Sequence, residues 1–319
     1  MEVAFIGGAG TVGATAAYTL AVERPSVDVT LVDVAEDAAE GHGIGIRHAR
    51  TLGSLPAFGD ATDLGSVSAK PSSTAGLATA DVAVVTASVP RPSSSARRGG
   101  RLEFLDRNLE LAESIAATLR EREPLPVIVA TNPMDRITQR IWRETGWDRD
   151  WFLGYSLSET ARTADRIASI RDVPADDVYC PVGGEHGENV VPFFSRLTVD
   201  GEPTTLTEAE KRDVREYVRD VPYDVIQLRG AGETSRWVTG QGVVRLVCAV
   251  LDDGLDDADH PIAASVPLDG EYGIEGACLS VPVEIGRSGV RRVIEWDLPE
   301  EEREGLRAAA DSVTSDPGQ

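Results

Sequence analysis

The sequence VAFIGGAGTVG, residues 3–13, sets the architecture of this chain, because four apolar residues run directly into a glycine-rich turn. An alanine-rich segment that favours a helix, residues 14–21, follows the turn. We predict that Gly8 permits the tight turn, Gly10 lets the main chain approach a pyrophosphate, and Gly13 lets the helix pack against the strand. This order is typical of dinucleotide-binding units, in which the helix N-terminus lies under the phosphates. A strand–turn–helix unit with incidental glycines is the alternative.

An acidic residue lies at the distance that such a unit requires. A second apolar strand, residues 29–32, ends in Asp33, twenty residues after Gly13. The Asp33 carboxylate would hold the ribose hydroxyls of a dinucleotide and would repel a 2′-phosphate. The following Val34-Ala35 supplies no arginine to accept such a phosphate. We therefore predict NAD rather than NADP as the cofactor.

Further apolar runs extend this unit into a sheet. Residues 82–86 and 127–130 are short, predominantly apolar segments, typical of buried parallel strands. Helices are predicted over residues 36–50 and 102–119. Residues 65–79 are rich in Ser, Ala, Gly and Pro, so we predict a flexible connection there. The pattern predicts an α/β fold with a doubly wound parallel sheet.

The length of the chain indicates two domains. At 319 residues and 41% hydrophobic content, it can bury a sizeable core in more than one unit. The helical pattern breaks at Thr-Gly-Trp-Asp, residues 145–148. We predict that residues 1–145 bind NAD, and that residues 146–319 form an α+β domain for substrate binding and catalysis.

The charge balance excludes several classes of partner. Acidic residues outnumber basic ones 53 to 31, for a net charge of −22. We infer adaptation to concentrated salt, where the Debye length shrinks to roughly 3 Å at 1 M. Nucleic acid and anionic membranes are poor partners for such a surface. An ordinary acidic cytosolic protein is the alternative.

The cysteines and histidines do not indicate a metal site or a disulfide framework. Three scattered cysteines suit a reducing compartment. His42 and His48 are interpreted as surface residues, and no ligand set for a metal is found. The sequence shows neither a leader nor an apolar run long enough to span a bilayer, so we predict a soluble, cytoplasmic protein.

An arginine-rich loop is predicted after the strand at residues 82–86. Residues 87–101 contain Pro90-Arg91-Pro92 and end in Gly-Gly-Arg101. In doubly wound folds ligands bind at this edge of the sheet, so the loop could close cationic groups over an anionic substrate. A solvated basic loop that balances local charge is the alternative. After the next predicted strand, Asn132 precedes a proline, where its amide could meet both cofactor and substrate, although Asn-Pro is also a common turn.

A candidate proton donor lies in the second half of the chain. His186 lies within Gly-Gly-Glu-His-Gly-Glu-Asn, residues 183–189, ahead of an alternating run at 191–199 that predicts a strand. A polar turn with a solvated histidine is the alternative. A predicted helix over residues 158–170 places Glu159 and Arg162 on one face. The pair is either a surface salt bridge or a cleft pair, in which Glu159 orients His186 and Arg162 grips a substrate carboxylate.

Together these motifs resemble the NAD-dependent lactate and malate dehydrogenases, most closely the lactate-dehydrogenase-like malate dehydrogenases of salt-loving archaea. The resemblance covers nearly the whole chain. It implies that His186 is the proton donor, Arg162 binds the substrate carboxylate, Arg101 polarises the carbonyl, and Arg91 selects a second carboxylate. Asn132 would lie near substrate and cofactor. The residues implied to bind the cofactor are Gly8, Gly10, Thr11, Val12, Gly13, Asp33, Thr86, Asn108, Thr131 and Asn132.

Three features depart from the family pattern. Glu159 stands where the family has an aspartate, the loop between Arg91 and Arg101 has about four extra residues, and the segment 229–237 is longer. Insertions in this loop accompany a change from malate to lactate in other branches of the family. We therefore expect a malate/oxaloacetate dehydrogenase, with lactate/pyruvate or another 2-keto acid as the alternative substrate.

The change at Glu159 also allows a non-catalytic NAD(H)-binding paralogue. Relatives are dimers or tetramers, so the resemblance implies a homo-oligomer, and the acidic surface would make its assembly depend on salt.

Overall fold

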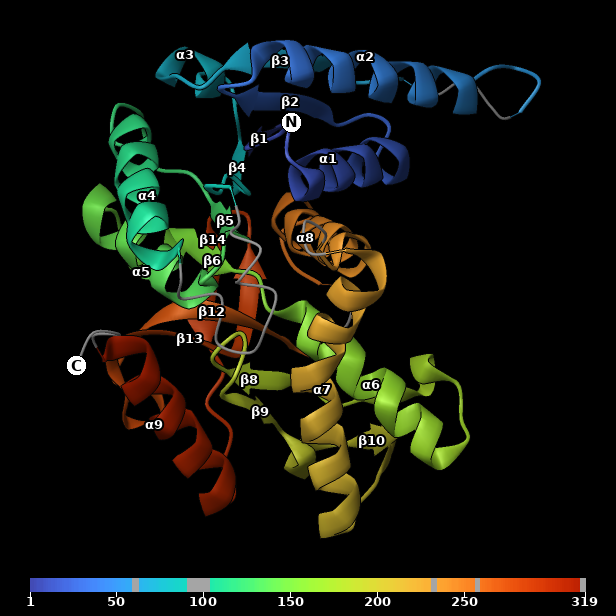
Figure 1. Ribbon diagram of the computed structural model, residues 1–319, viewed down its shortest axis with the longest axis vertical. Coiled ribbons are helices and arrows are strands. Elements are labelled where there is room, and N and C mark those ends of the chain that lie inside the picture. Colours follow the sequence, from blue (N-terminus) through green and yellow to red (C-terminus); the bar gives the residue numbers. More distant parts are fainter. Residues whose placement is uncertain (59–62, 91–103, 231–233, 256–258, 316–319) are drawn as a thin grey trace.

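A large mixed sheet forms the centre of the molecule (Figure 1). The computed structural model describes residues 1–58, 63–90, 104–230, 234–255 and 259–315. Within these ranges, 11 strands form one sheet and three short strands form a second one. The strands are β1 Glu2–Ile6, β2 Asp28–Asp33, β3 Val67–Pro71, β4 Val82–Val85, β5 Val127–Val129, β6 Phe152–Gly154, β7 Val178–Tyr179, β8 Val182–Gly184, β9 Val190–Pro192, β10 Thr198–Val199, β11 Glu202–Pro203, β12 Ile262–Asp269, β13 Glu275–Gly286 and β14 Gly289–Val293. The helices are α1 Thr11–Glu23, α2 Glu36–Gly53, α3 Thr74–Leu77, α4 Leu105–Leu119, α5 Met134–Thr145, α6 Leu157–Arg171, α7 Glu208–Arg229, α8 Arg236–Leu251 and α9 Glu300–Thr314.

The first part of the sheet is parallel and doubly wound. Its strand order is β3-β2-β1-β4-β5-β6, with every neighbouring pair parallel. Successive side chains of a strand face opposite sides, and both sides of this sheet are covered. Val3 and Phe5 of β1 pack in a core with α1, α2 and α8, whereas Ala4 and Ile6 pack in a separate core with α4 and α5. This arrangement confirms the predicted fold class of the N-terminal half.

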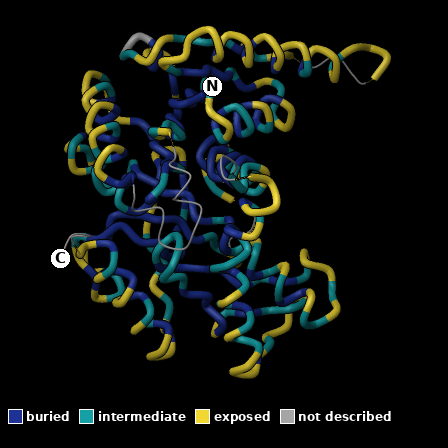
Figure 2. Tube along the Cα trace, viewed as in Figure 1, coloured by how far each residue is buried: buried dark blue, intermediate teal, exposed yellow. Residues whose placement is uncertain are grey.

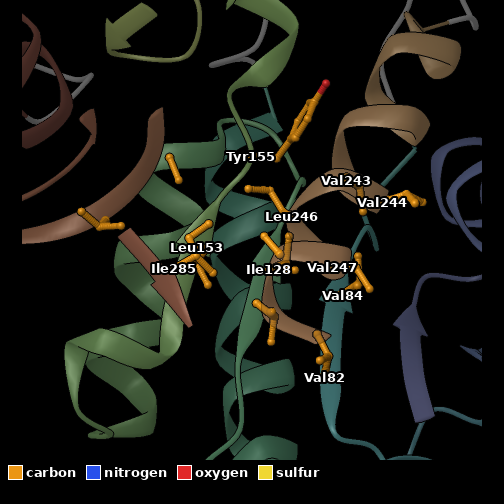
Figure 3. Close-up of a cluster of buried hydrophobic side chains, with 14 of the residues drawn as sticks. Val82, Val84, Ile128, Leu153, Tyr155, Val243, Val244, Leu246, Val247 and Ile285 are labelled. Carbon is orange, nitrogen blue, oxygen red and sulfur yellow. The ribbon is translucent and has the colours of Figure 1, made fainter. Parts of the chain in front are cut away.

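The core beneath α8 ties this helix to the parallel strands. Alternate strand residues from β4, β5 and β6 contact the apolar face of α8 in one continuous cluster. Figure 3 shows this packing for Val82, Val84, Ile128, Leu153, Val243, Leu246 and Val247. Because α8 comes from the second half of the sequence, the packing joins the two halves of the chain.

Two local predictions were wrong. The segment 65–79, predicted as a flexible connection, contains strand β3 and helix α3. Among the described strands, β3 pairs with β2 alone, and an edge strand can contain the Lys and Pro that a central strand excludes. The alternating run 191–199 is not one strand, because a 3-10 helix, Phe194–Arg196, separates β9 from β10.

The second half of the chain continues the same sheet with antiparallel strands. β12 pairs with β6, and the order then runs β12-β13-β8-β9, with β14 also on β13. Helices α6 and α7 pack with β7 and β9 around a third core. This combination of helices and antiparallel strands agrees with the predicted α+β class. The division at residue 145 stays a prediction, and β6, the last parallel strand, lies beyond it.

Burial follows the layers of the fold (Figure 2). The central strands of the large sheet are buried, whereas the outer faces of the helices are exposed. His42 and His48, on α2, are exposed as predicted. None of the described helices is long and apolar enough to cross a membrane.

Candidate active site

A cavity of about 650 Å³ lies at the carboxyl ends of the parallel strands. Its walls come from the turn after β1, the ends of β2, β4 and β5, the start of α6, the loop after β8, the last turns of α7, and the start of α8 with the two residues before it. Predicted site residues that line it are Gly10, Thr11, Val12, Asp33, Thr86, Thr131, Asn132, Arg162 and His186. The cavity therefore joins residues from both halves of the chain in one space.

The turn after β1 requires a glycine to which the sequence analysis gave no role, Gly7. Gly7, not Gly8, has a positive φ, of 88°. A Cβ at Gly7 would also lie 2.3 Å from the main-chain nitrogen of Ala87. Gly8 is instead required by close packing, since its Cβ would lie 2.9 Å from Leu31 Cα. The tight turn predicted for Gly8 thus depends on Gly7.

Gly10 and Gly13 have different surroundings. A Cβ at Gly13 would lie 2.3 Å from the Gly7 carbonyl oxygen and 2.6 Å from Thr86 Oγ1, so only glycine lets α1 approach the strands this closely. At Gly10, the N-cap of α1, a Cβ would meet only the Gly7 oxygen, at 3.2 Å. Gly10 faces the cavity, so the helix N-terminus is open to an anionic group there.

Asp33 holds the turn from the end of β2. Its Oδ2 accepts the main-chain N–H of Ala9 at 2.9 Å, and its Oδ1 accepts that of Ala35 at 2.9 Å. A carboxylate oxygen can accept more than one hydrogen bond, so Asp33 can still bind ribose hydroxyls while lining the cavity. Among the described lining residues, the basic ones are Arg162 and His186, and both come from the second half of the chain, whereas Asp33 lies in the first half.

Asn132 offers a polar atom to the cavity. Its Oδ1 is buried and has no partner among the described residues. A cis peptide bond links it to Pro133. Asn108 does not line the cavity but lies beneath it, fully buried, donating to the Asn132 carbonyl oxygen at 2.7 Å and accepting from the Val89 main chain at 2.9 Å. Thr131 likewise donates its hydroxyl to the Ala87 carbonyl oxygen at 2.7 Å.

The pair on α6 turns inward and meets the histidine. Glu159 Oε2 lies 2.9 Å from His186 Nδ1, and Glu159 Oε1 accepts from Arg162 Nη1 at 3.1 Å. The side chains are 3%, 8% and 12% exposed for Glu159, His186 and Arg162. Of the two readings of this pair, the geometry agrees with the cleft pair. A carboxylate accepts the Nδ1 hydrogen, which leaves Nε2 to exchange a proton with a ligand.

The extra methylene of Glu159 is used to reach the ring. Glu159 itself does not line the cavity, whereas Arg162 and His186 do. One buried carboxylate therefore lies behind two cationic or protonatable groups that face the cavity. Such an arrangement can bind a carboxylate and move a proton at a neighbouring oxygen.

Several contributors were missed from the sequence. Asp135 Oδ2 accepts the main-chain N–H of His186 at 2.8 Å. Other residues of the second half of the chain that line the cavity are Tyr155, Ser158, Pro222, Tyr223, Ile226, Thr234, Ser235 and Thr239. Thr234 and Ser235 belong to the lengthened segment 229–237, which the family resemblance places at the substrate pocket, whereas no sequence signal indicated the others. The predicted Arg91 and Arg101 lie outside the described residues.

Comparisons with known proteins cover nearly the whole chain. A family model described as lactate/malate dehydrogenase, NAD binding domain, matches residues 1–154. A second, described as lactate/malate dehydrogenase, alpha/beta C-terminal domain, matches residues 159–316. Malate dehydrogenase of Halobacterium salinarum is 31% identical over 98% of this chain and 97% of its own length. That of Natronomonas pharaonis is 30% identical over the same shares, and L-lactate dehydrogenase of Treponema denticola is 30% identical over 95% of this chain and 93% of its own.

Solved structures show the same fold. Malate dehydrogenase from Salinibacter ruber matches with a TM-score of 0.83 and 25% identity, over 98% of this chain and 95% of that one. Lactate dehydrogenase from Cryptosporidium parvum, solved with lactic acid and nicotinamide adenine dinucleotide, matches with a TM-score of 0.85 and 25% identity over the same shares. The chain thus belongs to the lactate/malate dehydrogenase family, whose NAD-dependent members are oxidoreductases that act on CH–OH groups.

Proposed function

We propose that this protein interconverts malate and oxaloacetate, with His186 exchanging the proton. The observation that carries the proposal is the buried contact of 2.9 Å between Glu159 Oε2 and His186 Nδ1 at the wall of the cavity. The curated relatives of salt-loving archaea that match nearly the whole chain are named malate dehydrogenases. Relatives named L-lactate dehydrogenase are 30% and 28% identical, so lactate/pyruvate is the second candidate.

The described residues can hold the cofactor at one end of the cavity. Gly10, Thr11 and Val12 would receive the pyrophosphate at the N-terminus of α1, and Asp33 would receive the ribose hydroxyls. Asn132 Oδ1, buried without a described partner, would bind the nicotinamide end. When bound, the nicotinamide supplies or accepts the hydride.

The remaining steps belong to the protein side chains. Arg162 would bind the C1 carboxylate of the keto acid and fix its orientation. Glu159 holds the Nδ1–H of His186, so that Nε2 gives its proton to the keto oxygen during reduction and takes it back during oxidation. The carboxylate of Glu159 stabilises the imidazolium that exists before the proton leaves. Arg101 would polarise the carbonyl, and Arg91 would pair with the second carboxylate of oxaloacetate.

Substrate choice can be tested through Arg91. The rate of NADH oxidation would be measured in concentrated KCl with oxaloacetate and with pyruvate, for the wild type, for Arg91→Gln, and for Arg107→Gln. Arg107 is exposed on α4, so its variant removes the same charge outside the proposed site. We expect oxaloacetate to be preferred, and only Arg91→Gln to lose the preference. A preference for pyruvate would contradict the malate assignment, and no turnover with either substrate despite NADH binding would favour a non-catalytic paralogue.

We also propose a homo-oligomer, a dimer or tetramer, whose assembly depends on salt. Large apolar side chains are exposed on neighbouring helices, among them Tyr18 and Val22 of α1 and Leu52 of α2. The net charge of −22 opposes association unless salt screens it. Sedimentation at low and high KCl should show a larger species in high salt, and a monomer under both conditions would contradict this.

The three free thiols suit a reducing cytoplasm, which we propose as the location.

A further inference from the structure

A buried carboxylate contacts the main chain of the proposed proton donor. Asp135 lies in the first turn of α5 and is 3% exposed. Its Oδ2 accepts the main-chain N–H of His186 at 2.8 Å, across 51 residues of sequence. α5 begins directly after Asn132-Pro133. Asp135 therefore joins the loop that carries His186 to the segment that carries Asn132.

The loop needs an anchor of this kind. Gly184 and Gly187 flank His186, and both have positive φ, of 83° and 148°. Such a loop has more conformational freedom than one built from residues with a Cβ. Glu159 fixes the direction of the imidazole ring but not the position of the main chain below it. Two contacts, one to the ring and one to the main chain, are needed to define where Nε2 lies.

Asp135 can serve as an acceptor with or without a charge. Burial raises its pKa to about 7, and the carboxylates of Glu185 and Glu159 act in the same direction. The hydrogen bond from the His186 main chain favours the ionised form. The nearby Ser265 hydroxyl also favours it, but does not reach hydrogen-bond geometry, since both it and Asp135 Oδ1 are without a partner among the described residues. With a proton on Oδ1, Oδ2 can still accept the His186 N–H.

We propose that Asp135 is a positioning residue, whose Oδ2 fixes the main chain of His186 relative to Asn132. This inference rests on the proposed function, because it takes His186 as the proton donor. The groups that face Asp135 are Glu185 of the same loop, Glu159 of α6, Ser265 of β12 and the Cys278 thiol of β13. None of them replaces the bond to the His186 main chain. The role is that of an acceptor, so a neutral amide of the same shape should fulfil it.

Hydrogen exchange tests the anchor without reference to activity. Mass spectrometry would follow amide exchange in the peptide 183–190 for the wild type, Asp135→Asn and Asp135→Ala. The Asn amide oxygen can take the place of Oδ2, while its NH₂ group can donate to the Ser265 hydroxyl. We expect slow exchange in the wild type and in Asp135→Asn, and faster exchange in Asp135→Ala. Unchanged exchange in Asp135→Ala would overturn the proposal.

Kinetics then test the consequence of the anchor. We expect kcat to fall on the order of 10²-fold in Asp135→Ala with an unchanged Kd for NADH, because a displacement of about 1 Å can cost this much. Asp135→Asn should restore the rate. If Asn restored slow exchange but not turnover, the acceptor role would be wrong and the charge would matter instead. If the wild type itself showed no turnover, the proposed function would fail while the exchange result still reported on the anchor.

A second buried carboxylate provides the matched control. Glu302, on α9, accepts the main-chain N–H of Ser195 at 2.9 Å and its hydroxyl at 2.6 Å. Glu302→Ala removes a comparable contact away from the cavity, by the same kind of truncation as Asp135→Ala. We expect it to alter exchange near residue 195 and to leave both the peptide 183–190 and kcat unchanged. The same loss of kcat in this control would show that Asp135→Ala acts through general destabilisation, and would overturn the positioning role. Asp135→Asn remains informative if Asp135→Ala does not fold.

Discussion

The two ends of the cavity are built in different ways. At the cofactor end, the turn from Gly7 to Gly13 presents main chain, and its shape depends on the absence of Cβ atoms. At the end proposed for catalysis, Arg162 and His186 present charged or protonatable side chains, Glu159 lies behind them, and all three are almost fully buried. The first end is contiguous in sequence, whereas 27 residues separate Glu159 from His186. The cofactor end should therefore be sensitive to added volume, and the catalytic end to lost or displaced polar atoms.

The largest effect is expected from removing the proton donor. His186→Ala should lower kcat by about 10³-fold, because general acid–base catalysis typically contributes factors of this size. The cofactor end contains no part of His186, so the Kd for NADH should stay near that of the wild type. Steady-state rates and NADH fluorescence titration measure the two ends separately. Retained turnover would remove His186 from the mechanism, and lost NADH binding would mean that the two ends are not independent.

A smaller loss is expected from shortening Glu159. Glu159→Asp introduces the residue that the family resemblance places here, but it moves the carboxylate back by about 1.5 Å. The contact of 2.9 Å with His186 would then be lost, so we expect kcat to fall on the order of 10²-fold. Glu159→Gln keeps the length and loses the charge, and so separates reach from electrostatics. A wild-type rate for Glu159→Asp would show that the main chain adjusts and that reach does not matter.

Adding volume at the cofactor end should affect binding instead. In Gly13→Ala the new Cβ would lie 2.3 Å from the Gly7 carbonyl oxygen, so α1 must move away from the turn. We expect the Kd for NADH to rise by about 10-fold, a change of about 1.4 kcal/mol. Gly41→Ala is the matched control, because its Cβ has no neighbour within 4 Å on α2. Equal effects from both variants would show that helix propensity, rather than the fit of α1, determines the result.

Asp135→Asn is expected to change turnover least but to change the pH dependence of stability. Burial raises the pKa of Asp135 from 3.8 to about 7 in the folded state. Below about pH 4 the carboxyl is protonated in both the folded and the unfolded state, so the folded state keeps its full stability. As the pH rises to about 7, the unfolded state ionises first, and the folded state loses stability. The loss amounts to at most about 4 kcal/mol. Asp135→Asn lacks this dependence, so its free energy of unfolding relative to the wild type should rise between these pH values. Denaturant unfolding at constant KCl measures it, and parallel pH curves for the two proteins would contradict the assignment.

The sequence predicted the cofactor end more completely than the other end, because only the cofactor end is built mainly from residues that are adjacent in the sequence. The glycine pattern, Asp33 and the apolar strands are local signals, and the fold and the place of the turn follow from them. The tight turn was assigned to Gly8, whereas the positive φ lies at Gly7, because spacing does not show which glycine takes that conformation. β3 was missed, since an edge strand carries no continuous apolar signal. Glu159 was found with an open alternative, and Asp135 was missed, because no local pattern indicates a contact across 51 residues.

A single-turnover experiment decides whether the two ends act together. NADH would be bound to an excess of wild-type enzyme in concentrated KCl, and its absorbance would be followed after rapid mixing with oxaloacetate. If the residues of the cavity act as proposed, bound NADH is oxidised in one phase in the wild type and persists in His186→Ala. Bound NADH that persists in the wild type with oxaloacetate and with pyruvate would contradict the proposal that this cavity is the active site of a 2-keto-acid reductase.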